Sequence, residues 1–83
     1  MKDAWHIYIL RCADGTLYTG VTTDLVRRVQ EHNESLKGAK YTRVRRPVSL
    51  VHSEVFENRS AACVREAAIK KLSRDEKTTL IEG

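Results

Sequence analysis

Residues 18–32 read Tyr18-Thr19-Gly20-Val21-Thr22-Thr23-Asp24-Leu25-Val26-Arg27-Arg28-Val29-Gln30-Glu31-His32. This order is typical of a strand that ends in a turn and is followed by an amphipathic helix. Thr22, Thr23 or Asp24 can cap the helix, and Asp24 also places a negative charge at its positive end. We expect the helix to run to about Leu36.

The apolar face of this helix carries two cationic or titratable groups. At 3.6 residues per turn, one stripe of the helix surface holds five side chains: Leu25, Arg28, Val29, His32 and Leu36. An unpaired arginine at the edge of a core costs several kcal/mol, against a total stability of roughly 5 to 15 kcal/mol. Arg28 therefore needs an anion, which is either a carboxylate of this chain or a phosphate of a ligand.

Composition predicts one small domain that spans residues 1–83. The chain has 83 residues, of which 41% are hydrophobic, and chains of this length bury only about 60 to 65% of their unfolded surface. The net charge is +4 and the sequence pI is near 9.3. This charge favours polyanionic partners, but it does not distinguish a nucleic-acid partner from a merely soluble surface.

The cysteines and the apolar runs predict a cytoplasmic protein without a membrane partner. Cys12 and Cys63 lack CxxC spacing and the histidines are scattered, so neither a zinc site nor a disulfide framework is indicated. No apolar run approaches the ~18 residues of a membrane span, and the N-terminus lacks the apolar segment of a signal peptide. The oligomeric state does not follow from the sequence.

A β-hairpin is expected before the helix, with strands on either side of Ala13-Asp14-Gly15. A two-residue turn would place Tyr8 and Tyr18 on opposite faces of the hairpin. A three-residue loop with a left-handed Gly15 pairs Tyr8 with Gly20 and places both tyrosines on one face. We predict this second register, because Gly20 opposite Tyr8 leaves open space beside two phenols.

The second half of the chain predicts a third strand and two further helices. The strand covers Val48 to Phe56, with Val48, Leu50 and Phe56 on one side and Val51 and Val55 on the other. A helix follows from Ala61 to Leu72, and the capping-box spacing of Ser73 and Glu76 begins a short final helix that docks Leu80 and Ile81. The predicted class is α/β of the α+β type, with a three-stranded antiparallel sheet flanked by helices in the order β-β-α-β-α-α.

A basic segment connects the first helix to the third strand. Residues 37–47 contain five basic residues and one aromatic residue, without an acidic residue: Lys37, Lys40, Tyr41, Arg43, Arg45 and Arg46. We expect an irregular loop whose cations follow a nucleic-acid backbone, with Tyr41 stacked on a base or a sugar. A solvated surface loop is an equal alternative.

Tyr8, Tyr18, Arg28, His32 and Glu66 form a set of side chains suited to a phosphodiester. Glutamate can hold a divalent metal, arginine offers a planar fork for phosphate oxygens, and a phenol or imidazole can move or orient a proton. The alternatives are structural. Each tyrosine can be a core-edge residue with a satisfied hydroxyl, and Arg28 can form an internal ion pair with Glu66.

At these residues the chain resembles the GIY-YIG nuclease family, and most closely its small stand-alone bacterial members. His6-Ile7-Tyr8 stands where the first tripeptide of the family falls, and Tyr18-Thr19-Gly20 stands where the second falls. The order downstream also matches, with Arg28 and His32 on the first helix and Glu66 on the second. Glycine and isoleucine of the family motifs are replaced by His6 and Thr19.

The resemblance implies a metal-dependent endonuclease that acts on DNA, branched and single-stranded forms included, in repair or recombination. It implies a three-stranded antiparallel sheet flanked by helices, with a single Mg²⁺ or Mn²⁺ held by Glu66. It also implies a water activated near Tyr8 and Tyr18, with Arg28 stabilising the phosphate and His32 assisting proton transfer. The loop around Lys40 would border the DNA groove.

Two alternatives to an active endonuclease remain. Many active members of the family carry an asparagine near the end of the domain, and this sequence has no evident counterpart. The chain could therefore be a catalytically weak nucleic-acid-binding module with the same fold. It could also be an interaction domain that works only when bound to a larger repair or recombination protein.

Overall fold

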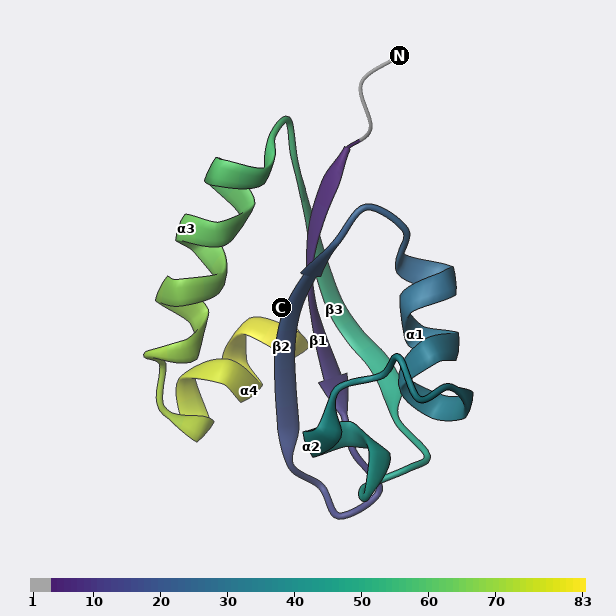
Figure 1. Ribbon diagram of the computed structural model, residues 1–83. Helices are drawn as coiled ribbons and strands as arrows, with labels where there is room; N and C mark the ends of the chain where they lie inside the picture. The colour runs from purple at the N-terminus through teal and green to yellow at the C-terminus, as the bar shows by residue number, and fades with distance from the viewer. Residues whose placement is uncertain (1–3) are drawn as a thin grey trace.

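The computed structural model describes residues 4–83, which form three strands and four helices (Figure 1). In chain order these are β1 (Trp5–Arg11), β2 (Leu17–Thr22), α1 (Leu25–Glu34), α2 (Lys40–Arg43), β3 (Ser49–Phe56), α3 (Arg59–Lys70) and α4 (Arg74–Glu82). The predicted α+β class and the flanked antiparallel sheet are confirmed. The short helix α2 is an addition to the predicted order.

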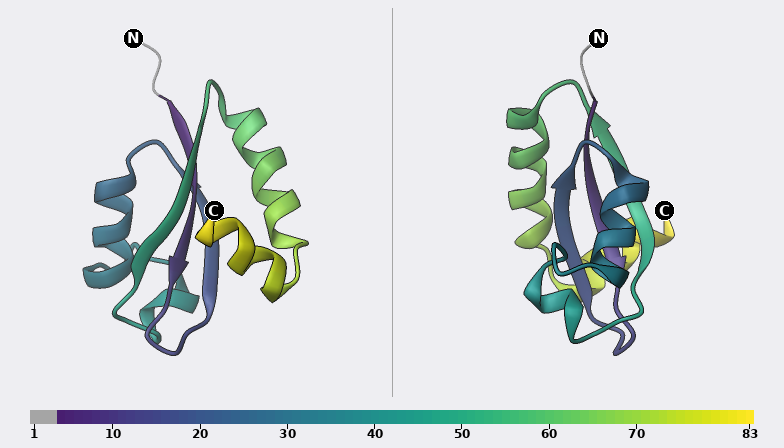
Figure 2. Two further views of the ribbon diagram at one scale, coloured as in Figure 1. Left: turned by 180° about the vertical axis from the view of Figure 1, so that it is seen from behind. Right: turned by 45° about the vertical axis from the view of Figure 1, so that its right-hand side comes forward.

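The sheet lies between two layers of helices, and its strand order is β2-β1-β3. Helices α1 and α2 lie on one side of it and α3 and α4 on the other (Figures 1 and 2). The central strand β1 supplies both cores, because successive strand residues point to opposite faces. Ile7 and Ile9 pack with Ala62 and Ile69, whereas Tyr8, Leu10 and Cys12 pack with Val48 beside α1.

The hairpin has the register that we predicted. Tyr8 pairs with Gly20 and Leu10 pairs with Tyr18, so both tyrosines lie on the α1 face of the sheet. Gly15 is left-handed at φ 84°, and its amide donates to the carbonyl of Cys12 at 2.9 Å. The three-residue loop therefore fixes which face the two phenols occupy.

Helix α1 begins as predicted and ends earlier than predicted. The Asp24 carboxylate accepts from the Arg27 amide at 3.0 Å, which identifies the cap among the three candidates. The helix stops at Glu34, because Ser35 is extended at φ −118° and ψ 152°. Leu36 is 85% exposed, so its assignment to the apolar stripe was wrong.

The two later helices also differ from the prediction in their bounds. Helix α3 spans Arg59–Lys70, and it starts at Arg59 because the side chain of Asn58 caps it by accepting from the Ala61 amide at 2.8 Å. Helix α4 has the predicted capping box between Ser73 and Glu76. Its residues Leu80 and Ile81 pack against the core, as expected.

The predicted faces of β3 were wrong, because the strand contains a bulge. Ile9 pairs with His52, but the next residue, Leu10, pairs with Leu50, so Val51 is an extra residue. Val51 and Phe56 consequently pack against one core and Val48 belongs to the other. Val55 is 64% exposed.

The basic segment is partly helical rather than an irregular loop throughout, since α2 occupies Lys40–Arg43. It continues to the edge strand β3, and α2 packs against α1. Within residues 4–83, every helix is too short or too polar to cross a lipid bilayer.

Candidate active site

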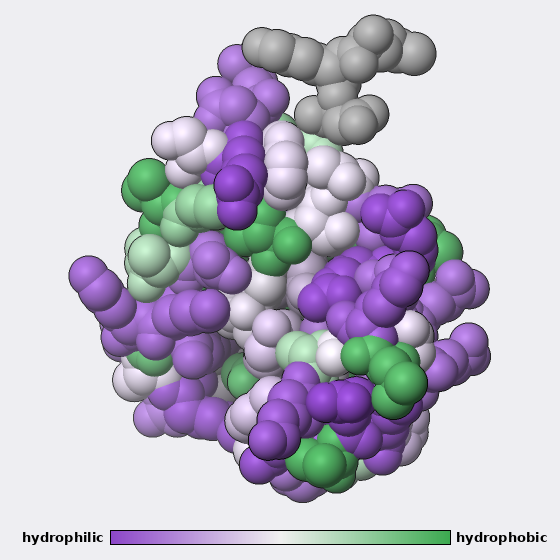
Figure 3. Space-filling model, in the orientation of Figure 1, coloured by the Kyte–Doolittle hydropathy of each residue, from purple (hydrophilic) through white to green (hydrophobic). Residues whose placement is uncertain are grey.

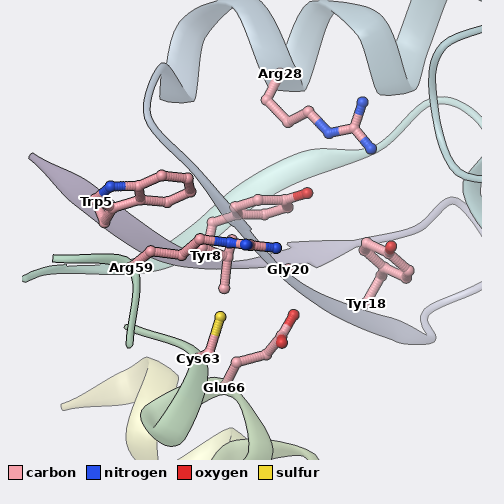
Figure 4. A pocket seen from close by; sticks show the side chains of 9 residues that line it. Trp5, Tyr8, Tyr18, Gly20, Arg28, Arg59, Cys63 and Glu66 are labelled. Carbon is pink, nitrogen blue, oxygen red and sulfur yellow. The ribbon is translucent and has the colours of Figure 1, made fainter. Parts of the chain in front are cut away.

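A cavity of about 550 Å³ lies beside the edge strand β2, and side chains from both faces of the sheet line it. They belong to β1, β2, α1 and α3: Trp5, Tyr8, Tyr18, Gly20, Val21, Arg28, Arg59, Cys63 and Glu66 (Figure 4). In the space-filling view, residues of intermediate hydropathy lie at the centre of this face with hydrophilic side chains around them (Figure 3). The open edge of the sheet allows residues of both helical layers to share one cavity.

Gly20 makes room for Tyr8 at this edge. A Cβ atom on Gly20 would lie 2.5 Å from Cζ of the Tyr8 ring, which is closer than such atoms approach in proteins. The ring end of Tyr8 therefore occupies the space that a side chain at position 20 would fill. The predicted structural role of Gly20 has this steric basis.

The Tyr8 hydroxyl is joined to a buried histidine. It lies 2.9 Å from Nε2 of His32, whose other ring nitrogen lies 2.7 Å from the Thr42 hydroxyl. Burial, followed by the nearby Arg28 charge, lowers the pKa of His32 to about 4. Burial also raises the pKa of Tyr8, and hydrogen bonding to Arg28 opposes that rise. At neutral pH both rings are therefore uncharged.

Tyr18 connects this pair to the basic segment. Its ring centroid is 5.3 Å from that of His32 and 5.9 Å from that of Tyr41, on which it stacks. The guanidinium of Arg45 lies 3.9 Å from the centroid of the Tyr41 ring, in the position of a cation–π contact. The structure thus brings Tyr41 and Arg45 next to the predicted catalytic tyrosines.

Arg28 is held in place from one side. Its Nη1 donates to the Glu31 carboxylate at 3.0 Å and to the Lys37 carbonyl at 2.9 Å. Its guanidinium points from α1 toward the cavity, opposite Glu66 of α3 (Figure 4). The alternative of an internal Arg28–Glu66 ion pair is therefore wrong, because the carboxylate paired with Arg28 is that of Glu31.

Glu66 enters the cavity from α3. Its Oε2 lies 3.6 Å from Nζ of Lys70, and the side chains are 23% and 55% exposed. An ion pair this long and this exposed is weak. The carboxylate is therefore accessible to a ligand in the cavity.

Comparison with known proteins agrees with this arrangement. The GIY-YIG catalytic domain matches residues 4–79. The chain belongs to the GIY-YIG family. Similar full-length proteins include the UPF0213 protein of Desulfotalea psychrophila, which is 58% identical over 99% of this chain and 74% of its own length. A UPF0213 protein of Staphylococcus aureus is 49% identical over 96% of both chains.

Solved structures show the same fold. The solution structure of the UPF0213 protein of Bacillus halodurans has a TM-score of 0.61 and 46% identity, and the match covers 95% of this chain and 83% of that one. A protein of E. faecalis has a TM-score of 0.65 and 46% identity, with 99% and 88% covered. The GIY-YIG domain described here is therefore similar to small proteins of about its own size.

The donor chemistry of the cavity fits the divalent ion that GIY-YIG membership implies. Within residues 4–83, there is no group of three or more His, Cys, Asp and Glu side chains placed to hold a metal. Mg²⁺ does not require one, because it keeps several waters and binds proteins through one or two carboxylates plus substrate phosphates. Glu66 is the carboxylate that lines this cavity.

The predicted nucleic-acid-binding residues of the GIY-YIG domain divide into two groups. Within the described chain, Lys37, Lys40 and Arg43 have no ion-pair partner, and all three are exposed. Arg45 instead pairs with Asp14 at 3.1 Å. Arg46 donates to carbonyls at the end of α1, those of His32 at 2.5 Å and Ser35 at 2.6 Å. DNA contact by these residues stays a prediction.

Sequence reasoning missed several residues of the cavity. Arg59 and Cys63 were not singled out, although they precede Glu66 at the i, i+4 and i+7 spacing that places side chains on one helix face. That spacing could have found them. Trp5 of the cavity and Thr42, which contacts His32 outside the cavity lining, gave no such signal, because their positions depend on how distant segments pack.

Proposed function

We propose that this GIY-YIG domain is a metal-dependent endonuclease that hydrolyses phosphodiester bonds of DNA in repair or recombination. The observation that supports the proposal is the arrangement of Tyr8, Tyr18, Arg28 and Glu66 around one cavity, although they belong to four different elements. A purely structural role would not explain why these four side chains gather around one cavity. Each of these side chains is polar, and the cavity remains open between them.

Arg28 and the tyrosines would act directly on the substrate. The guanidinium of Arg28, fixed by Glu31 and the Lys37 carbonyl, binds phosphate oxygens and stabilises the charge that develops on them. A preorganised donor of this kind is typically worth about a hundredfold to a thousandfold in rate. The hydroxyls of Tyr8 and Tyr18 orient the attacking water beside the phosphate.

A divalent ion, Mg²⁺ or Mn²⁺, would be held by Glu66. When bound, it supplies charge neutralisation at the phosphate and a site that organises water. Lys70 releases the carboxylate easily, because the pair is long and partly exposed. Arg59 adds a second guanidinium to the same cavity, and Lys37, Lys40 and Arg43 extend the positive surface beyond it.

The experiment is a cleavage assay with branched, single-stranded and duplex DNA in Mg²⁺, Mn²⁺ or EDTA. We expect cleavage with either metal and none with EDTA, and loss of at least a hundredfold in Glu66→Gln and Arg28→Ala. Glu82→Gln is the matched control, because it removes the same charge from an exposed position at the end of α4. Full activity in Glu66→Gln would show that the site assignment is wrong.

A second candidate is a catalytically weak nucleic-acid-binding module, favoured by the exposed cations Lys37, Lys40 and Arg43 of the basic segment. DNA binding without cleavage in any metal would support it. Activity that appears only with a larger repair protein would support a partner-dependent domain. A cytoplasmic location accords with all three functions and stays a prediction.

A further inference from the structure

His32 lies in a fully enclosed site between the cavity and the basic segment. Its side chain is 0% exposed, as is that of Thr42. Three groups contact its ring nitrogens: the Tyr8 hydroxyl at 2.9 Å from Nε2, the Thr42 hydroxyl at 2.7 Å from Nδ1, and the Ala39 amide at 3.4 Å from Nδ1. These contacts determine which nitrogen carries the proton.

The Ala39 amide decides which ring nitrogen of His32 carries the proton. A neutral imidazole has one N–H donor and one lone pair, whereas a backbone amide can only donate and its direction is fixed by the peptide plane. The Ala39 amide points at Nδ1, so Nδ1 must hold the lone pair. The part of the chain that the structure describes offers this amide no other acceptor.

The Thr42 hydroxyl can adapt to this arrangement. Its Oγ1 also lies 2.9 Å from the Ala39 carbonyl, which would favour the opposite tautomer if the hydroxyl proton pointed there. That carbonyl already accepts from the amides of Thr42 and Arg43, each at 3.1 Å. The hydroxyl is therefore free to turn toward Nδ1, with which it makes the shorter contact, and it then shares the single lone pair of Nδ1 with the more distant Ala39 amide.

We propose that Ala39 and Thr42 lock His32 in the Nε2–H tautomer, so that its imidazole donates a hydrogen bond to the Tyr8 oxygen. Thr42 is then a positioning residue that acts through His32. The consequence for Tyr8 follows from its single hydroxyl proton. Because Nε2 has no lone pair to accept it, this proton points toward the cavity instead.

This assignment gives His32 a role different from the proton transfer that the family resemblance implies. A neutral imidazole at pH 7 agrees with the low pKa of this buried ring. His32 holds the Tyr8 oxygen in place, and Tyr8 presents its proton to water or phosphate in the cavity. This last consequence rests on the proposed nuclease function, whereas the tautomer itself does not.

The tautomer can be measured directly by long-range ¹H–¹⁵N NMR of the uniformly labelled full chain at pH 7. We expect His32 to show a protonated Nε2 and an unprotonated, hydrogen-bonded Nδ1. A protonated Nδ1 in the wild-type protein would overturn the proposal. Because this measurement needs no substitution, it decides the question even where a variant fails to fold.

Two substitutions test the part played by Thr42. Thr42→Val keeps the shape of the side chain without its hydroxyl, and Thr42→Ser keeps the hydroxyl. We expect the Nδ1 resonance of His32 to move downfield in Thr42→Val, as its hydrogen bond weakens, and to stay in place in Thr42→Ser. An unchanged Nδ1 resonance in a folded Thr42→Val protein would contradict the role of Thr42.

The catalytic consequence has its own measurement. For DNA cleavage we expect Thr42→Val to lower kcat about tenfold with KM unchanged, since one orienting hydrogen bond is lost. In Tyr8→Phe the same substitution should have no further effect, because both act through one oxygen. If Thr42→Val lowered kcat by the same factor in the wild type and in Tyr8→Phe, the link from Thr42 to Tyr8 would be refuted. Absence of cleavage in the wild type would refute the nuclease function and leave the NMR result standing.

Discussion

Gly20 lies directly across from Tyr8 in the β1–β2 pair, and the end of the Tyr8 ring occupies the place of its missing side chain. A methyl group at position 20 would meet an aromatic ring that is itself buried, so neither can yield easily. We predict that Gly20→Ala lowers the free energy of unfolding by about 1–3 kcal/mol. It should also lower DNA cleavage at least a hundredfold, because the Tyr8 hydroxyl leaves its partner His32.

Gly15→Ala is the matched control for this substitution. Gly15 has a positive φ of 84° and no atom within 4 Å of an added Cβ. Alanine there should cost about 1 kcal/mol through backbone strain alone. Urea unfolding and cleavage assays on both variants separate the two effects: Gly15→Ala should lose stability and keep activity. Equal activity in the two variants would mean that Gly20 acts only through stability.

His32 predicts a specific dependence of stability on pH. Burial lowers the pKa of His32 to about 4, whereas the unfolded chain has the ordinary value near 6.5. As the pH falls, the unfolded state therefore binds the proton first. The full contribution is present above about pH 6.5, and below it the free energy of unfolding should decrease by about 1.4 kcal/mol per pH unit until about pH 4.

Urea unfolding between pH 7 and pH 4.5 measures this slope, and NMR titration identifies its source. The ring resonances of His32 should remain those of neutral imidazole down to about pH 5. In His32→Gln the free energy of unfolding should fall less steeply as the pH decreases, because the imidazole that binds one proton in the unfolded state is absent. A His32 ring that titrates near pH 6.5 in the folded protein would exclude it as the cause.

The sequence predicted the elements that local patterns determine. The hairpin register followed from one turn, because Gly15 permits the left-handed conformation. The first helix and the α4 capping box also followed from caps and periodicity. The β3 faces did not, because a single bulged residue, Val51, inverts the alternation on which that prediction relied.

The candidate site shows the same division. Arg28 could be selected because it lies in the apolar stripe of the first helix, where an unpaired charge is costly, and Glu66 because the family resemblance places it on the second helix. The partners of Arg28 could not, since Lys37 contributes a backbone carbonyl that has no signature in sequence. The link from His32 to Thr42 likewise depends on α2, a helix that the charge pattern of the segment concealed.

An ion-pair cluster on β3 and α3 predicts a second pH effect, at lower pH. The Arg65 guanidinium donates to both oxygens of Glu54 at 2.8 and 3.1 Å, and His52 is 2.8 Å from the same carboxylate. Hydrogen bonds from Arg65, and to a smaller extent from His52, lower the pKa of Glu54. This stabilisation is present above the ordinary pKa of glutamate and is lost as the pH falls through the depressed value.

Glu54→Gln tests this cluster. The substitution should lower the free energy of unfolding at pH 7 by about 0.5 to 1 kcal/mol, because the pair is partly exposed. As the pH falls below the depressed pKa of Glu54, the wild type and the variant should approach equal stability. A difference that stays constant from pH 7 to pH 3 would assign the effect to packing rather than to charge.

Arg59 provides a test of how far the substrate extends in the cavity. It lines the cavity beside Trp5, with its guanidinium 5.9 Å from the Trp5 ring. If Arg59 contacts a phosphate next to the scissile one, Arg59→Ala should raise KM about tenfold and leave kcat nearly unchanged. Lys71→Ala, an exposed cation just beyond α3, is the control. A loss confined to kcat would place Arg59 at the scissile phosphate instead.

The basic segment makes a prediction that distinguishes DNA contacts from structural contacts. Lys40 and Arg43 are exposed on α2, whereas Arg46 donates to the carbonyls of His32 and Ser35 at the end of α1. Lys40→Ala and Arg43→Ala should each reduce by about one the slope of log affinity for duplex DNA against log salt concentration. Arg46→Ala should leave that slope unchanged and lower the free energy of unfolding by about 1–3 kcal/mol, because it removes charged hydrogen bonds from partly buried carbonyls. Salt titrations of binding and urea unfolding on the same three variants provide both quantities. A slope reduced by Arg46→Ala alone would reverse the two roles, because the helix-capping arginine would then be the residue that contacts phosphate.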